Sequence, residues 1–112
     1  MMTKASLDWN ECLQLANNKA DLANDLVSML EKELPIFQNN LKKAAKTNDI
    51  EQLQHQAHKL HGACCYTGVP RLKELIQKLE SEIKTKPQDQ LTPLLNQIDT
   101  EINNILKAIK NR

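Results

Sequence analysis

Apolar residues recur at intervals of three and four along most of this sequence, and this periodicity limits the possible folds most strongly. Such intervals place side chains on one face of an α-helix, whereas a half-buried β-strand needs strict alternation. No stretch of the sequence alternates in that way. Leu, Ile and Ala dominate the apolar residues, which favours helix packing over a sheet. The sequence therefore predicts an all-α fold.

Breaks in the periodicity define the first two predicted helices. A short helix is expected over about residues 9–16, with Asp8 as its N-cap and Glu11 reaching back in a capping box. The Asn-Asn pair that follows ends it, and a long helix should cover 20–46. Pro35 must either kink this helix or divide it into two stacked pieces. The apolar stripe expected to face the core is Leu22, Leu26, Met29, Leu30 and Leu34.

Two further helices, about 49–66 and about 70–85, are predicted around a short connection. Asp49 is the expected N-cap of the first. Gly68 is expected to end it as a C′ residue with positive φ, and Pro70 suits the first turn of the next helix. A connection this short makes the two helices antiparallel. The stripe predicted for the first is Ile50, Leu53, Ala57, Leu60 and Cys64, and that for the second is Leu72, Leu75, Ile76, Leu79 and Ile83.

The last predicted helix follows a loop over residues 84–90 and has Thr92 as N-cap and Pro93 as first helical residue. Its expected stripe is Leu94, Leu95, Ile98, Ile102, Ile105, Leu106 and Ile109. The whole chain, 1–112, is expected to form a single domain, since this length supports one core. The predicted fold is an antiparallel up-down four-helix bundle with a short extra N-terminal helix.

Composition excludes several classes of function. The net charge of +1 comes from interspersed signs, so no basic face indicates nucleic-acid binding. No apolar run approaches the roughly 18 residues of a membrane span, and the N-terminus lacks the apolar core of a signal peptide. Three cysteines, two of them adjacent, indicate a reducing compartment. We therefore expect a cytoplasmic domain without direct membrane contact. A monomer is expected because it is the default state for this fold.

The candidate functional site is the segment His58-Lys59-Leu60-His61-Gly62. His58 lies about 100° around the helix from Ala57, beside the apolar stripe, so it should be partly exposed. Gly62 lies one turn further along, although glycine within a helix costs about 1 kcal/mol relative to alanine. A bare turn there would let a bulky partner bring its backbone close to the His58 imidazole.

An accessible imidazole on a rigid helix suits phosphoryl transfer. The neutral ring has a free lone pair and acts as a nucleophile near neutral pH. Phosphoryl transfer requires access, positioning and charge stabilisation, and Lys59 and His61 could offset phosphate charge. The sequence has no P-loop or glycine-rich nucleotide loop. No autonomous kinase activity is therefore expected, and the phosphoryl group must come from a partner.

Two alternatives to phosphoryl transfer remain open. His55, His58 and His61 recur every three residues and could be read as a metal-binding set. A structural zinc site needs four ligands, however, and the adjacent Cys64 and Cys65 point about 100° apart on a helix, so we expect no bound metal. A non-catalytic helical interaction module would explain the apolar stripes but not a glycine within the helix.

The segment 58–62, followed by Gly68, Leu72 and Leu75, resembles the signature of histidine-containing phosphotransfer (HPt) domains. The resemblance extends over most of the chain, including the Leu7-Asp8-Trp9 opening and the Leu79-Glu80 pair. With Cys64, Tyr66 and the run Gly68-Val69-Pro70-Arg71, the sequence is most similar to the C-terminal HPt domain of BarA/GacS-type hybrid sensor kinases.

This resemblance implies a histidine phosphocarrier in a multistep phosphorelay, with His58 as the phosphorylation site. Its partners would be response-regulator receiver domains, which carry an aspartate and supply the Mg²⁺, so no cofactor is expected in this domain. A receiver would dock around His58 through His55, Gly62 and Cys65. If the chain is part of a hybrid kinase, it would lie on the cytoplasmic side of the inner membrane.

Two positions near His58 distinguish this chain within the family. Many HPt domains have lysine where this chain has His61, so a titratable group replaces a fixed charge; the BarA-type subset shares the histidine. Glu80 stands where the family often has a polar residue facing the active histidine. It could accept a hydrogen bond from the inner nitrogen of His58 and fix its tautomer, or it could be a solvated surface carboxylate.

Overall fold

The computed structural model describes residues 5–112, and within that range it contains helices and no strand. The first four residues of the predicted domain lie outside the described part. In chain order the elements are α1 (Trp9–Leu15), α2 (Ala20–Lys46), α3 (Ile50–Cys64), α4 (Pro70–Ile83), the 3₁₀ helix η1 (Gln88–Leu91) and α5 (Thr92–Lys110). No helix in this range is both long enough and apolar enough to cross a membrane.

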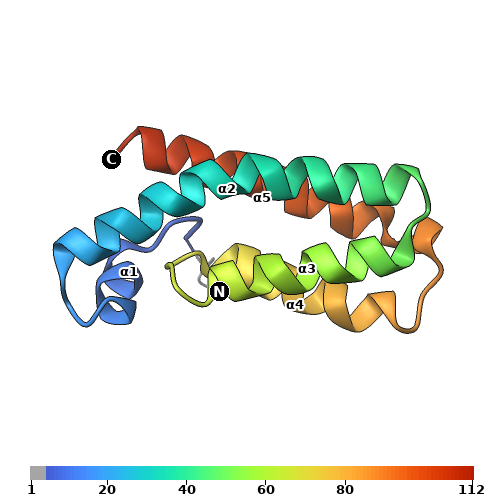
Figure 1. Ribbon diagram of the computed structural model, residues 1–112, viewed down its shortest axis with the longest axis horizontal. Helices are drawn as coiled ribbons and strands as arrows, with labels where there is room; N and C mark the ends of the chain where they lie inside the picture. The colour runs from blue at the N-terminus through green and yellow to red at the C-terminus, as the bar shows by residue number, and fades with distance from the viewer. Residues whose placement is uncertain (1–4) are drawn as a thin grey trace.

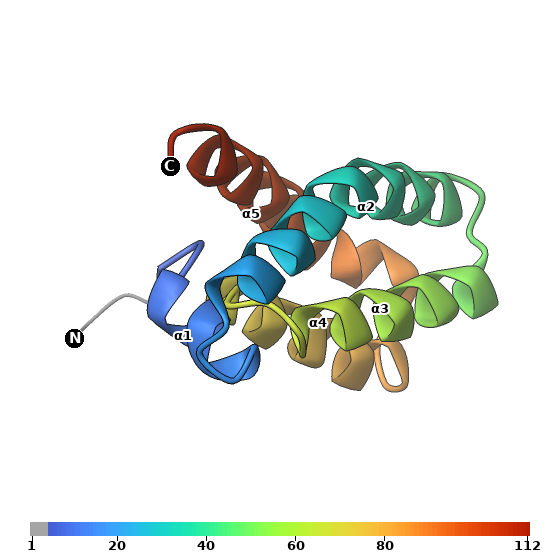
Figure 2. The same ribbon diagram turned by 60° about the vertical axis from the view of Figure 1, so that its left-hand side comes forward.

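Helices α2 to α5 form the bundle, and the short α1 packs at one end of it (Figures 1 and 2). Helix α3 packs against α2 and α4, and α5 packs against α4 and α2, so the four helices surround one core. The α3–α4 pair, joined by a tight connection, lies opposite α2 and α5 in Figure 1. The predicted all-α four-helix bundle with an extra N-terminal helix is confirmed.

The predicted capping box at the start of α1 is only half formed. The Asp8 carboxylate accepts a hydrogen bond from the Glu11 backbone N–H at 3.1 Å, as a helix N-cap should. The Asp8 N–H, however, donates to the carbonyl oxygen of Gly68 at 2.8 Å. The reciprocal partner is thus the α3–α4 connection and not the Glu11 side chain, which ties α1 to the rest of the fold.

Helix α2 is continuous through Pro35, so the alternative of two stacked pieces is wrong. The ribbon changes direction along its length in Figure 1, as a kinked helix would. Part of the predicted stripe is also wrong, because Leu22 and Met29 are 42% and 55% exposed. In the first half of the helix the buried positions Ala23 and Val27 each follow a predicted residue by one position, which is a rotation of about 100°. Leu30 and Leu34 are buried as predicted. The buried face consists of Ala23, Val27, Leu30, Leu34, Leu41 and Ala44.

Gly68 does not adopt the positive φ predicted for it. It is required for a different reason, which is close contact between segments. A β-carbon at this position would lie 2.2 Å from the Asp8 carbonyl oxygen and 2.9 Å from the Cys12 nitrogen. The Gly68 N–H also donates to the Cys12 sulfur at 3.1 Å. The glycine therefore lets α1 pack directly on the backbone of the α3–α4 connection.

The other helix boundaries depart only slightly from prediction. Asp49 caps α3 by accepting from the Gln52 N–H at 3.1 Å, but Ile50, at the exposed first turn, is 37% exposed. The loop expected before α5 includes η1. Leu91 occupies the N-cap position of α5, so Thr92 is its first helical residue and provides no side-chain cap.

Candidate functional site

His58 lies on the outer surface of α3. The helix turns its buried positions, Leu53, Ala57 and Leu60, toward the core, and His58 falls beside that stripe. Its side chain is 79% exposed, which is more open than the partial exposure expected from sequence. The imidazole is therefore accessible to a macromolecule approaching α3.

Glu80, on the neighbouring helix α4, faces His58 and His61 together. Its Oε2 lies 3.3 Å from Nδ1 of His58, and its Oε1 lies 2.8 Å from Nδ1 of His61. The carboxylate side chain is 25% exposed. The structure therefore places Glu80 between the two imidazoles and does not leave it as a solvated surface group, which was the alternative considered from sequence.

The His61 ring has a second neighbour on α4. Its Nε2 lies 3.4 Å from the amide nitrogen of Gln77, which precedes Glu80 by one helical turn. His61 is half-buried, with 27% of its side chain exposed. Gln77 was not recognised as a site residue in the sequence, although its position three residues before Glu80 puts both side chains on one face of α4.

Gly62 lies one turn beyond His58 on α3 and faces open space. A β-carbon at this position would meet no described atom within 4 Å, its own helix backbone aside. The space above this turn is therefore free of atoms from residues 5–112, as the hypothesis of partner access requires. The same surface includes Cys65, which is exposed at the end of α3.

The side chains of the remaining predicted site residues form no hydrogen bond or ion pair with His58. His55, Lys59 and Cys65 are all exposed, and none of their side chains forms a hydrogen bond or ion pair within residues 5–112. Lys59 instead borders a mainly apolar hollow of about 380 Å³ between α2 and α3. Side chains that line this hollow include Leu26, Met29, Phe37, Ala63 and Tyr66.

The two adjacent cysteines have opposite environments. Cys64 is 1% exposed, and burial raises the pKa of its thiol to about 12, with the neighbouring Cys65 adding to the effect. Cys12 is also buried, and burial raises the pKa of its thiol as well. Both were expected to be core residues, and both are. In the part of the chain that is described, no three His, Cys, Asp or Glu side chains are placed to hold a metal ion.

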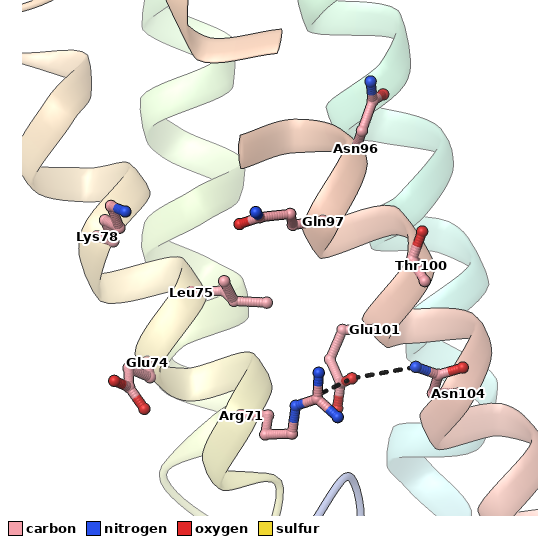
Figure 3. Close-up of a pocket in the computed structure, with 9 residues that line it drawn as sticks. All are labelled: Arg71, Glu74, Leu75, Lys78, Asn96, Gln97, Thr100, Glu101 and Asn104. Atoms are coloured by element: carbon pink, nitrogen blue, oxygen red, sulfur yellow. Dashed lines mark hydrogen bonds and ion pairs between the residues drawn. The ribbon is translucent and has the colours of Figure 1, made fainter. Parts of the chain in front are cut away.

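A cavity of about 740 Å³ lies away from His58, between α4 and α5 (Figure 3). At its base Glu101 is almost completely buried, with one carboxylate oxygen 3.7 Å from Nε of Arg71 and 3.3 Å from the Asn104 amide nitrogen. Sequence reasoning missed this buried charge. The sequence does indicate burial at position 101, because this position has the same helical spacing as the core residues Ile98, Ile102 and Ile105.

Comparison with known proteins gives consistent matches. Residues 25–111 match the family model of the Hpt domain. Over 105 residues the chain is 39% identical to the signal transduction histidine-protein kinase BarA of Escherichia coli, covering 92% of this chain and 11% of BarA. Over 78 residues it is 42% identical to the sensor histidine kinase GacS of Pseudomonas protegens, covering 70% of this chain and 8% of GacS.

A solved structure matches along almost the whole chain. The HPT domain of a hybrid histidine kinase from Shewanella superimposes with a TM-score of 0.89 and 36% sequence identity. The match covers 95% of this chain and 92% of that domain. The chain thus corresponds to a whole domain of that kind, and to only a small part of the full-length kinases.

Proposed function

The chain belongs to the Hpt-domain family, and from this premise we propose that His58 is its phosphorylation site, receiving a phosphoryl group from one receiver-domain aspartate and passing it to another. Histidine phosphotransfer within a phosphorelay follows from the family. The assignment of His58 as the phosphorylated residue and of receiver domains as its partners is the proposal.

The exposure of the His58 imidazole and the direction it faces carry the assignment to this residue. The side chain is 79% exposed, and Nδ1 is the ring nitrogen that meets the Glu80 carboxylate. A carboxylate accepts hydrogen bonds, so a neutral ring places its proton on Nδ1. The lone pair then lies on Nε2, which is the nitrogen free to react. His61, by contrast, has both ring nitrogens in contact with α4 side chains.

The proposed step is an in-line transfer between two carrier groups. The Nε2 lone pair attacks the phosphorus of an aspartyl phosphate, a bond from Nε2 to phosphorus forms, and the bond from phosphorus to the aspartate oxygen breaks with its electron pair returning to the carboxylate. The ring gains positive charge while Nδ1 keeps its proton. Glu80 stabilises that charge electrostatically as it develops. Return of the phosphoryl group to a second aspartate reverses these changes.

The proposed partners are receiver domains that bring their own Mg²⁺. They would dock on the exposed surface formed by His55, His58, Gly62 and Cys65. The apolar hollow between α2 and α3 adjoins this surface through Lys59, and the exposed Met29 and Tyr66 at its border provide apolar contact area. An apolar centre with a polar rim is typical of a specific protein interface.

We further propose that the domain has no kinase activity of its own. Its phosphoryl donor is another domain, and in a hybrid kinase of the BarA or GacS type that donor would be held in the same protein on the cytoplasmic side of the inner membrane. The isolated domain is proposed to be monomeric. Lys59 and His61 remain candidates for offsetting phosphate charge.

A phosphotransfer assay tests the assignment of His58. The domain is mixed with a radiolabelled phosphorylated receiver and Mg²⁺, beside His58→Gln and the matched control His55→Gln. We expect label to reach the unsubstituted domain and His55→Gln but not His58→Gln. The labelled product should be stable to base and labile to acid, as expected of a phosphoramidate.

Label on His58→Gln would contradict the assignment, whereas slower transfer to His55→Gln would reflect the docking role proposed for that residue. No transfer from any of several receivers would contradict the proposed phosphocarrier function of this chain. Circular dichroism on both variants separates these results from unfolding, and neither exposed side chain contributes to the core.

A further inference from the structure

We propose that His61 and Gln77 are positioning residues, which hold the Glu80 carboxylate so that it keeps the His58 proton on Nδ1. The inference rests on the proposed function of His58. It arises from one continuous set of contacts across the α3–α4 interface. Gln77 Nε2 lies 3.4 Å from His61 Nε2. His61 Nδ1 lies 2.8 Å from Glu80 Oε1, and Glu80 Oε2 lies 3.3 Å from His58 Nδ1.

The two neighbours of His61, the Glu80 carboxylate and the Gln77 amide, favour the same tautomer of its ring. An amide N–H₂ group can only donate, so Nε2 of His61, 3.4 Å away, must accept. A neutral ring that accepts at Nε2 has its proton on Nδ1, which donates to Glu80 Oε1. The two contacts therefore favour the Nδ1–H tautomer of the neutral His61 ring, which then forms a hydrogen-bonded link between Gln77 and Glu80.

The same contacts anchor Glu80 at one end. His61 and Glu80 are 27% and 25% exposed and lie 2.8 Å apart, whereas His58 is 79% exposed and lies 3.3 Å from the other carboxylate oxygen. The shorter and less exposed contact fixes the carboxylate. The longer contact then only has to orient an exposed ring, because its acceptor is already in place.

The consequence for transfer concerns the reacting state of His58. Only the Nδ1–H tautomer presents the Nε2 lone pair to phosphorus, and the ring charge formed by the attack is offset only if the carboxylate stays beside Nδ1. Loosening Glu80 therefore lowers the rate of the chemical step. It leaves receiver docking unchanged, because Gln77 does not belong to the docking surface proposed above.

Gln77→Met tests the inference without changing His58, Glu80 or His61. Methionine keeps a similar length but cannot donate to Nε2. We expect the transfer rate at saturating receiver to fall about two- to tenfold, the range of one hydrogen bond's net effect, with the half-saturating receiver concentration unchanged. Histidine ¹⁵N NMR should show a lower Nδ1–H fraction for His61 and for His58. Gln97→Met, an exposed glutamine on α5, is the matched control and should change neither.

The inference is overturned if His61 of the unsubstituted chain carries its proton on Nε2, or if Gln77→Met leaves both tautomers and the rate as they were. A change in the half-saturating concentration alone would assign Gln77 to docking, which also overturns it. Absence of transfer by the unsubstituted chain would instead refute the proposed function, and the NMR spectra would still decide the hydrogen-bonded arrangement.

Discussion

The two glycines of this chain lie six residues apart in opposite surroundings. Around Gly62 a β-carbon would meet no described atom within 4 Å, whereas at Gly68 it would lie 2.2 Å from the Asp8 carbonyl oxygen. The first is on the outer face of α3, and the second is enclosed between α1 and the α3–α4 connection. Neither has a positive φ, so backbone conformation explains neither of them.

The difference shows that a missing side chain can serve two unrelated purposes. At Gly68 the space is used within the molecule, because α1 packs on it through the Asp8 N–H and the Cys12 sulfur. At Gly62 the space is unused within the molecule, and helix propensity alone would favour alanine. The packing of the fold thus explains Gly68. It does not explain Gly62, and we propose that this turn is kept free for a partner.

The largest expected effect is on phosphoryl transfer in Gly62→Trp. The indole would stand beside His58 and keep a receiver at a distance, while the fold has open space to accept it. A displacement of about 1 Å from the reacting geometry can cost about 100-fold in rate, so we expect a loss of at least that size in the transfer assay. The free energy of unfolding should change by no more than about 0.5 kcal/mol.

Gly62→Glu offers a second test of the same access argument. Its bulk should also block transfer in a folded domain, and its charge would additionally repel the phosphoryl group. An unchanged transfer rate in folded Gly62→Trp would contradict the idea that this turn is kept bare for a partner.

Gly68→Ala should have the opposite effect, on stability. The added methyl group must push α1 away from the connection, because the two nearest atoms it meets are backbone and cannot rotate aside. Overpacking of this kind costs about 1–3 kcal/mol, measurable by urea denaturation. The residual folded fraction should still accept label on His58. Unchanged stability would show that α1 is held only loosely.

The placement of Gly62 beside His58 could be predicted from sequence, and the packing role of Gly68 could not. Gly62 and His58 belong to one helix, so their separation of one turn follows from helical geometry. Gly68 contacts residues some 60 positions earlier, and no local pattern encodes that contact. The position of Gly68 after a helix predicts a positive φ, which the residue does not adopt. The glycine is needed for the close packing of α1 instead.

The same division between local and long-range information applies to the acidic residues. The contact of Glu80 with His58 was considered from sequence because family resemblance paired these positions. Its second contact, with His61, depends on how α3 and α4 pack side by side. Glu101 was missed although its position fits the core spacing of α5, because a charged residue is normally assigned to the surface.

The adjacent thiols extend the comparison between exposed and enclosed sites. Burial raises the pKa of Cys64 to about 12, so the folded chain keeps this proton at pH values where an unfolded chain loses it. The unfolded state is therefore favoured as pH rises above the ordinary thiol pKa, by at most about 1.4 kcal/mol per pH unit. We expect urea denaturation between pH 9 and pH 11 to show a smaller decline in Cys64→Ala than in the control Cys65→Ala. Equal declines would contradict the effect of burial.

Gly62→Ala is expected to have the smallest effect on transfer of the Gly62 variants. It tests whether even a methyl group at this turn hinders a docking partner. A methyl group adds helix propensity and meets no described atom, so the free energy of unfolding should rise by up to about 1 kcal/mol in urea denaturation. Transfer should slow, but less than in Gly62→Trp, because a methyl group displaces a docking backbone only slightly. If the variant is more stable and transfers at the original rate, a methyl group is compatible with docking and only larger side chains are excluded. If it is more stable and slower, the chain gives up helix stability at this turn in exchange for access to His58.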